Sequence, residues 1–276
     1  MRVVLDLLLF LATLLYSYLE ALLKLFVPVR KKSISGELVL VTGAGHGVGR
    51  ATAFEFAKQH SRLVLWDINQ HGLEETAAQC RKLGATVQTF VVDCSKREEI
   101  YSAAEKVKKE IGDVSILVNN AGVITTADLL STQDHQIQRM FEVNILAHMW
   151  TTRAFLPAMM DTNHGHIVTV ASAAGHLVTP LMVAYCLLGQ LLPLLCSHPA
   201  SDLAALLPRL GKILEVEEVV EALMEGVLTN KKMVFVPPQL SFALLSEMLF
   251  PERALNVLKK LFEAKFDAVV GQRSTQ

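Results

Sequence analysis

The chain has 276 residues, which is enough for one α/β domain with a sizeable core. Its 26 basic and 27 acidic residues give a formal net charge of −1, so the sequence lacks the basic footprint of a nucleic-acid-binding protein. Hydrophobic residues make up 51% of the chain and the mean hydropathy is +0.37, a composition that suggests membrane contact. None of the four cysteines forms a C-x-x-C pair, so neither a zinc site nor a disulfide framework is indicated, and a reducing compartment fits.

Residues 1–32 are predicted to form a hydrophobic anchor. The stretch Val3–Val29 is almost wholly apolar, and the basic triplet Arg30–Lys32 follows it. No small-residue cleavage site follows the apolar core, which argues against a removed signal peptide. A spanning helix would enclose Glu20 and Lys24 at a cost of a few kcal/mol each, whereas an interfacial helix would carry this i,i+4 pair on its polar edge. We expect an uncleaved membrane anchor with the triplet at the cytosolic surface. A buried or oligomer-forming helix is the alternative.

After a short linker, short apolar runs alternate with amphipathic helical patterns. This alternation predicts an α/β fold with a doubly wound parallel sheet, in a single domain over residues 36–276. The predicted strands are Leu38–Thr42, Arg62–Asp67, Thr86–Asp93, Ser115–Asn119 and His166–Ser172. The first three intervening helices should end near Gln59, Leu83 and Ile111, and a longer helix should cover about 131–160.

The pattern changes after Tyr185. Residues 187–211 are atypical, because they are rich in leucine but interrupted by Gly189 and by three prolines. Order returns with a predicted helix over Glu215–Leu228 and a predicted strand over Met233–Pro237.

A glycine-rich motif, T-G-A-G-H-G-V-G-R, occupies residues 42–50 between the first strand and its helix. Such glycines allow a tight turn and let backbone N–H groups approach a pyrophosphate at the positive helix end, as in Rossmann-type folds. An ordinary strand–helix turn is the alternative. The predicted cofactor contacts in the motif are Gly43, His46, Gly47, Val48 and Gly49.

Asp67 ends the second predicted strand, 24 positions after Gly43. A carboxylate there can accept hydrogen bonds from the adenine ribose hydroxyls and repel a 2′-phosphate. The sequence therefore predicts NAD over NADP, although an aspartate at this place can also simply start a turn.

Two further motifs complete a pattern. Asn119-Asn120-Ala121-Gly122 ends the fourth strand, and Ser172 precedes Tyr185 by 13 positions. Together with the glycine loop, they resemble the short-chain dehydrogenase/reductase family over about residues 36–186, and again from about 212. The resemblance implies that Tyr185 is the catalytic acid/base, that Ser172 binds the reacting substrate oxygen, and that Asn144 holds a proton-relay water. It also implies adenine contacts at Asp93 and Cys94 and cofactor contacts at Asn120, Ala121 and Gly122.

Longer matches are similar to one membrane-associated branch of this family. They include L-V-L-W-D-I-N, V-V-D-C-S, F-E-V-N-I-L-A-H and N-H-G-H-I-V-T-V-A-S-A-A-G-H. The branch implies NAD-dependent oxidation of a 17β-hydroxysteroid or similar lipophilic alcohol to the ketone, with a retinol-type dehydrogenase as an alternative. It also implies the endoplasmic reticulum membrane and lipid droplet, with the catalytic domain facing the cytosol. A homodimer is a candidate assembly. No metal site is expected, since His164 and His166 flank Gly165 in a loop.

One position departs from the family. The family places a lysine four residues after the catalytic tyrosine, on the same helix face, and here that residue is Gly189. A tyrosine has an ordinary pKa of about 10, and a nearby cation favours its ionised form. The segment between Tyr185 and Glu215 is also too short for the family's next helix, sixth strand and substrate loop, so the sheet is predicted to lack that strand.

Two interpretations of this departure compete. In one, the chain is a catalytically impaired or misfolded isoform, through splicing or an error in the gene structure, or a non-catalytic lipid-droplet protein. In the other, it is a divergent enzyme with a rebuilt wall. We favour the first and predict a loss of kcat of at least about 10²-fold.

Overall fold

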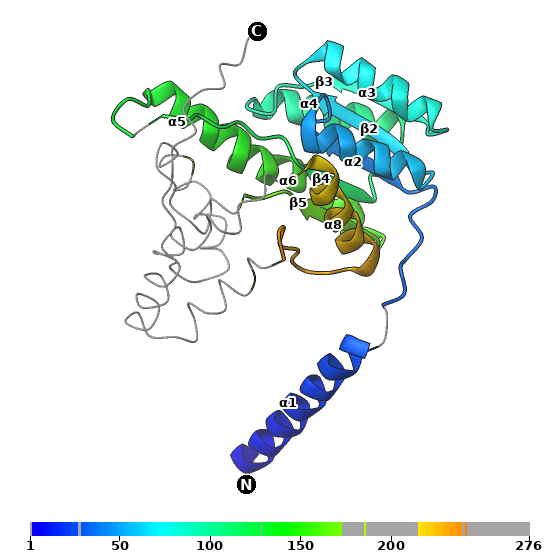
Figure 1. Cartoon of the computed structure of the whole chain (residues 1–276), viewed down its shortest axis with the longest axis vertical. Helices are drawn as coiled ribbons and strands as arrows, with labels where there is room; N and C mark the ends of the chain where they lie inside the picture. Colours follow the sequence, from blue (N-terminus) through cyan, green and yellow to red (C-terminus); the bar gives the residue numbers. More distant parts are fainter. Residues whose placement is uncertain are drawn as a thin grey trace.

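The computed structural model describes residues 2–26, 29–127, 129–172, 185, 215–238 and 241. Its centre is a five-stranded parallel sheet in the order β3-β2-β1-β4-β5 (Figure 1). The strands are β1 (Leu38–Thr42), β2 (Arg62–Asp67), β3 (Val87–Val91), β4 (Ile116–Asn119) and β5 (His166–Thr169). All four strand pairings are parallel, so the carboxyl ends of the strands meet at one edge. The predicted Rossmann-type doubly wound sheet is confirmed.

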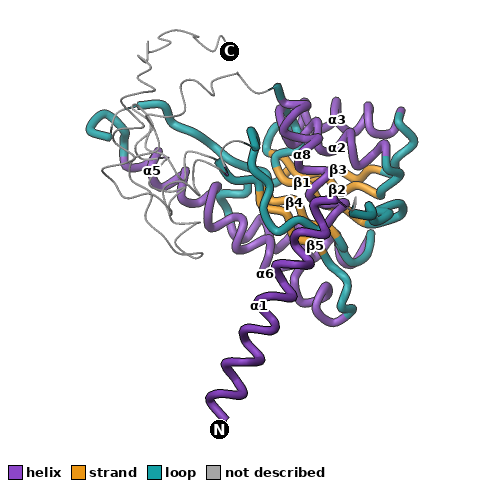
Figure 2. Tube along the Cα trace, turned by 60° about the horizontal axis from the view of Figure 1, so that its bottom comes forward, coloured by secondary structure: helices purple, strands orange, loops and turns teal. Residues whose placement is uncertain are grey.

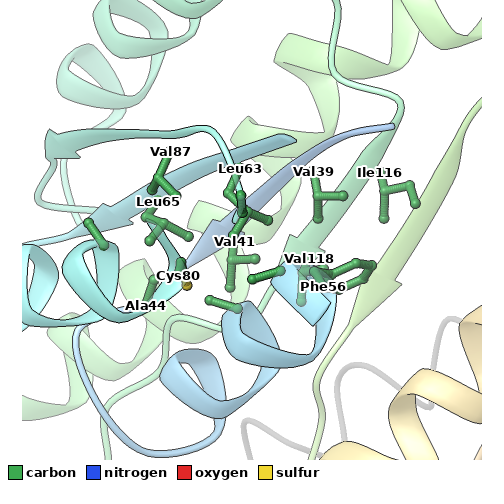
Figure 3. Packing of buried hydrophobic residues seen from close by; sticks show 14 of the residues in the cluster. Val39, Val41, Ala44, Phe56, Leu63, Leu65, Cys80, Val87, Ile116 and Val118 are labelled. Atoms are coloured by element: carbon green, nitrogen blue, oxygen red, sulfur yellow. The ribbon is translucent and has the colours of Figure 1, made fainter. Parts of the chain in front are cut away.

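Helices cover both faces of the sheet because the strands are apolar on both sides. One face packs against α2 (Gly47–Lys58), α3 (Gln70–Lys82) and α8 (Val216–Thr229). The other packs against α4 (Arg97–Glu110) and α6 (Ala147–Asp161). Alternate residues of β1 serve the two cores: Val39 and Val41 join the first, and Leu38 and Leu40 join the second. Figure 3 shows the first core around Phe56 of α2.

The region before β5 is a nearly continuous helix with an irregular middle. It consists of α5 (Asp134–Phe141), a π-helical turn η1 (Glu142–Leu146) and α6. One long helix was expected over this range, and the π-turn was not foreseen. Strands β1 and β2 have the expected bounds, whereas β3, β4 and β5 are shorter than expected.

The predicted strand at Met233–Pro237 is wrong. These residues form none of the five strands and lie in a loop after α8. An apolar run becomes a strand only where a neighbour takes up its backbone hydrogen bonds, and no described strand does so here. Gly189 and residues 187–211, with the predicted loss of the sixth strand, lie outside the described residues.

The N-terminal segment forms one helix, α1 (Arg2–Phe26), as expected. Its described side chains are all exposed, including large apolar ones such as Leu8 at 59% and Leu15 at 63%. Figure 2 shows α1 extending away from the strands. In the described part of the chain, no helix meets the length and hydropathy needed to cross a membrane.

Candidate functional site

The glycine loop joins β1 to the N-terminus of α2 at the carboxyl edge of the sheet. Gly43 and Gly47 have positive φ angles of 67° and 54°, which favour glycine. A Cβ on Gly43 would lie 2.8 Å from the Cα of Ala121, and one on Gly49 would overlap the carbonyl oxygen of Gly43. At Gly47 there is open space instead. The loop therefore exposes backbone at the start of a helix, where N–H groups can hold an anion.

The other two predicted loop residues occupy different surroundings. His46 is the N-cap residue of α2, and its exposed side chain makes no capping hydrogen bond. Val48 is half-buried and packs against the first core. His46 is thus placed to meet a ligand from outside, whereas Val48 also helps to fix the helix to the sheet.

Asp67 lies at the end of β2 and faces the glycine loop. Its Oδ2 accepts a hydrogen bond from the N–H of Gly45 at 2.7 Å, and its Oδ1 accepts one from the N–H of Asn69 at 2.8 Å. A carboxylate has about four acceptor positions, so two remain for ribose hydroxyls. A Cβ on Gly45 would lie 2.8 Å from the carboxyl carbon of Asp67, so this residue pair requires the glycine. The remaining acceptor positions fit the adenine ribose hydroxyls of a dinucleotide.

Asp93 and Cys94 follow β3 at the same edge. Burial opposes ionisation of Asp93, but hydrogen bonds from the backbone and hydroxyl of Ser95 and the charge of Arg139 outweigh it and lower its pKa. Burial, followed by the nearby charges of Asp93 and Asp67, raises the pKa of the Cys94 thiol to about 12. Cys94 is therefore a neutral wall residue near Asp67 and not a nucleophile.

The Asn119–Gly122 turn is tied to the end of β1 through Thr42. The Thr42 hydroxyl accepts hydrogen bonds from the N–H groups of Asn120 and Ala121, both at 3.0 Å. The side-chain amide of Asn120 donates to the carbonyl oxygens of Thr42 and Gly43, at 3.0 and 3.2 Å. The end of β1 and the Asn119–Gly122 turn are thus joined by hydrogen bonds, and we call this joined region the floor of the site. The individual role of Thr42 was not predicted, although a lone polar residue closing an apolar strand is a usable signal.

His148 supports the same turn from α6. Its Nε2 lies 3.0 Å from the carbonyl oxygen of Ala121, and its Nδ1 is buried without a hydrogen-bond partner. Burial lowers the pKa of His148, and the hydrogen bond to Ala121 offsets this only in part. The neutral ring donates from Nε2 to Ala121. His148 was not predicted, but it lies four residues after Asn144 and so on the same helix face.

Asn144 lies in the π-turn η1. Its Oδ1 accepts from the N–H of Val123 and its Nδ2 donates to the carbonyl of Val123, both at 2.8 Å. A Cβ on Gly122 would lie 3.5 Å from this Oδ1. Single π-turns inside α-helices are frequent at functional sites. Here the turn brings Asn144 against the loop that follows β4.

Tyr185 packs near the same place, in a small apolar cluster centred on buried Met140. Val123, which is hydrogen-bonded to Asn144, packs against the same cluster, so Tyr185 and Asn144 lie in one neighbourhood around Met140. Ser172 lies three residues beyond β5 and is exposed. No group of three metal-ligating side chains occurs within the part of the chain that the structure describes.

Residues 37–187 match the short chain dehydrogenase family. The chain belongs to the short-chain dehydrogenase/reductase family. It is 56% identical to estradiol 17-beta-dehydrogenase 11 of Rattus norvegicus and 51% identical to 17-beta-hydroxysteroid dehydrogenase 13 of Homo sapiens. Each alignment covers 99% of this chain and 99% of the relative. The resemblance to a 17β-hydroxysteroid dehydrogenase branch of the family, expected from the longer matches, is confirmed.

Solved structures of the family share the fold. A short-chain dehydrogenase/reductase from Burkholderia phymatum in complex with NAD has a TM-score of 0.68 at 22% identity, covering 86% of this chain and 99% of the other. A metagenomic short-chain oxidoreductase in complex with NADP has a TM-score of 0.62 at 26% identity, covering 72% and 92%. This short-chain dehydrogenase is therefore an oxidoreductase with a nicotinamide dinucleotide site.

The alignment with the rat relative also bears on length. It extends over 298 positions, whereas this short-chain dehydrogenase has 276 residues. Some aligned positions therefore have no residue in this chain.

Proposed function

We propose that this chain is an NAD-binding member of the 17β-hydroxysteroid dehydrogenase branch, whose substrate class is a 17β-hydroxysteroid or similar lipophilic secondary alcohol. The proposal of this substrate class rests on the 56% identity with the rat relative along nearly the whole of both chains. The free acceptor positions of Asp67, beside the glycine loop, support NAD over NADP because a 2′-phosphate would meet a carboxylate. Retinol is the alternative substrate to test.

The residues at the carboxyl edge divide the work. The glycine loop and Asp67 would hold the pyrophosphate and the adenine ribose, and the floor fixed by Thr42 would lie against the nicotinamide side. When bound, NAD supplies a hydride acceptor. The Tyr185 hydroxyl group, once ionised, takes the proton of the substrate alcohol, while Ser172 binds the substrate oxygen. Asn144 positions the loop at Val123, which packs with Tyr185 around Met140.

We further propose that catalysis is impaired in this chain. The residue four positions after Tyr185 is Gly189, so the cation that activates the tyrosine in the family is absent from that position. The 298 aligned positions against 276 residues support a shortened segment. Loss of acid/base catalysis costs about 10²–10⁴-fold in rate, and we expect kcat to be lower by at least about 10²-fold.

The same proposal includes attachment of α1 to a lipid surface. Its exposed leucines form an apolar surface far larger than soluble proteins leave uncovered. An interfacial position at the endoplasmic reticulum membrane or lipid droplet, with the body in the cytosol, suits this helix and the basic triplet after it. The proposed assembly is a homodimer.

Two measurements on the full chain test the proposal. The unfolding temperature should rise by several degrees with NAD at about 100 times its Kd, since such binding adds about 2.7 kcal/mol to the free energy of unfolding. NADP at the same concentration should raise the unfolding temperature by clearly less. Estradiol and retinol oxidation, followed as NADH formation, should be at least about 10²-fold slower than for the rat relative. Equal shifts with both dinucleotides would refute the NAD preference. Turnover at the relative's rate would refute impairment.

A further inference from the structure

The base of the α/β body, at the amino ends of the strands, carries cations from two segments far apart in sequence. Lys32 binds the end of α8 twice: its N–H donates to the carbonyl of Leu228, and its Nζ donates to Oδ1 of Asn230, both at 2.8 Å. These bonds place the basic triplet beside the two lysines that follow Asn230. We call the resulting set the basal patch, comprising Arg30, Lys31, Lys32, Lys231 and Lys232.

The basal patch keeps most of its charge. Glu225 is one acidic residue beside it: the hydrogen bond from Lys231 lowers the pKa of Glu225, and the charge of Lys31 adds to the effect. Glu37 is a second, close enough for its charge to act on Lys32. Five basic residues thus face two acidic ones. Arg30 and Lys232 are exposed and make no ion pair with any residue that the structure describes. Such a surface attracts an anionic partner.

The patch is held close to α1. Only five residues separate Phe26, the last residue of α1, from Lys32, so these two lie within about 20 Å of each other. The following linker is fixed to the body, because Ile34 is buried and its carbonyl accepts from the Ser61 hydroxyl at 2.9 Å. Figure 1 shows the chain passing from α1 to β1 beside the end of α8. A lipid surface that holds α1 would therefore lie near the patch.

We propose that the basal patch docks on the headgroups of an anionic phospholipid surface and acts as a second contact beside α1. The inference rests on the proposed attachment of α1. Met233 and Val234, which follow Lys232, are 61% and 38% exposed and add apolar side chains next to the cations. A single weak anchor binds membranes reversibly, and an adjacent cluster of basic residues is one way to make attachment stable. The patch also sets which edge of the sheet faces the lipid.

The test is co-flotation of the full chain with vesicles of phosphatidylcholine alone or with added phosphatidylserine. Each lysine near an anionic surface contributes about fivefold in affinity at low salt. We expect Lys231→Ala with Lys232→Ala to weaken binding to the anionic vesicles by about 25-fold and to leave binding to neutral vesicles unchanged. Glu225→Gln should strengthen binding to the anionic vesicles by about fivefold. At 1 M salt, where the Debye length is about 3 Å, these differences should disappear.

A matched control removes the same charge from the opposite edge. Lys96 and Arg97 follow β3 at the carboxyl edge, so Lys96→Ala with Arg97→Ala should bind anionic vesicles as the wild type does. Equal effects of the two double variants, or none from Lys231→Ala with Lys232→Ala, would overturn the docking surface. Unchanged thermal unfolding of the variants confirms folding, and Glu225→Gln tests the patch independently.

The same vesicle assay distinguishes a failure of α1 attachment from a failure of the basal patch. Wild-type binding to anionic vesicles alone, lost in the lysine variant, would support the patch while refuting attachment by α1. Binding to neither vesicle would refute both proposals.

Discussion

At the scale of single residues, substitutions of two glycines can distinguish an effect on backbone strain from an effect on cofactor binding. Gly47 and Gly84 both have positive φ angles and open space where a Cβ would stand, but only Gly47 lies at the start of α2. Alanine at either position should cost about 1–2 kcal/mol of stability. Only Gly47→Ala should also lose the rise in unfolding temperature that NAD produces. A full NAD response in Gly47→Ala would show that the cofactor lies elsewhere.

His148 makes stability depend on pH. Its folded pKa lies below the ordinary value of 6.5, so the unfolded chain binds the proton more readily. The contribution of neutral His148 to folding stability is therefore fully present above about pH 6.5, and it is lost as the pH falls below that value. The unfolding temperature should fall between pH 7.5 and 5.5, and less steeply in His148→Gln.

Part of the slope should survive in that variant. Burial and the charge of Lys32 also lower the pKa of His166, which remains to titrate in the same direction. Replacement of exposed His135 by glutamine serves as the control and should leave the slope as it is. An identical slope in His148→Gln and wild type would contradict the assignment.

At the scale of elements, the strands were the most predictable part of the fold. β1 and β2 are buried on both faces, so their apolar runs begin and end where the strands do. β5 has an exposed alternate face and ends earlier than its apolar run suggests. The loop at Met233 carries the same apolar signal without a partner strand. Pairing depends on neighbours distant in sequence, which a local pattern does not encode.

The π-turn η1 could not be predicted for a different reason. One extra residue in a helical turn shifts the side-chain pattern too little to stand out among many apolar positions. The candidate site shows the same division. The glycine loop, Asp67 and the Asn119–Gly122 turn followed from spacing, whereas the roles of Thr42 and His148 depend on contacts between elements.

The link between η1 and the loop after β4 can be tested at Asn144. Asn144→Ala removes both hydrogen bonds to Val123, each with a net value of about 1 kcal/mol. We expect the unfolding temperature to fall by about 4–8 °C. Asn144→Asp keeps an acceptor for the Val123 N–H but places a second acceptor oxygen against the Val123 carbonyl, so it should also lower the unfolding temperature. Gln138→Ala, at an exposed position of α5, is the control, and a loss as large as that of Asn144→Ala would contradict the assignment.

At the scale of the whole molecule, the cofactor half and the segment after Tyr185 are separable. The sheet, the second core and the floor of the site consist of residues that precede Tyr185. The first core also does so, except for the residues that α8 contributes. α8, which follows the atypical segment in sequence, packs against α2 and completes the first core. We therefore expect the body to fold and to bind a nicotinamide dinucleotide independently of residues 187–211, so that impaired catalysis need not mean an unfolded protein.

The final prediction follows from that separation. Replacing residues 186–214 by the corresponding segment of the rat relative should raise estradiol-dependent NADH formation by at least about 10²-fold, because it returns the lysine and the substrate wall together. Gly189→Lys alone should not do so, since a cation can favour the ionised tyrosine but leaves the residues after it unchanged. Tyr185→Phe within the chimera should abolish the gain, which ties it to proton transfer. If Gly189→Lys alone restored the full rate, the rest of the segment would be competent and the impairment would lie in a single side chain.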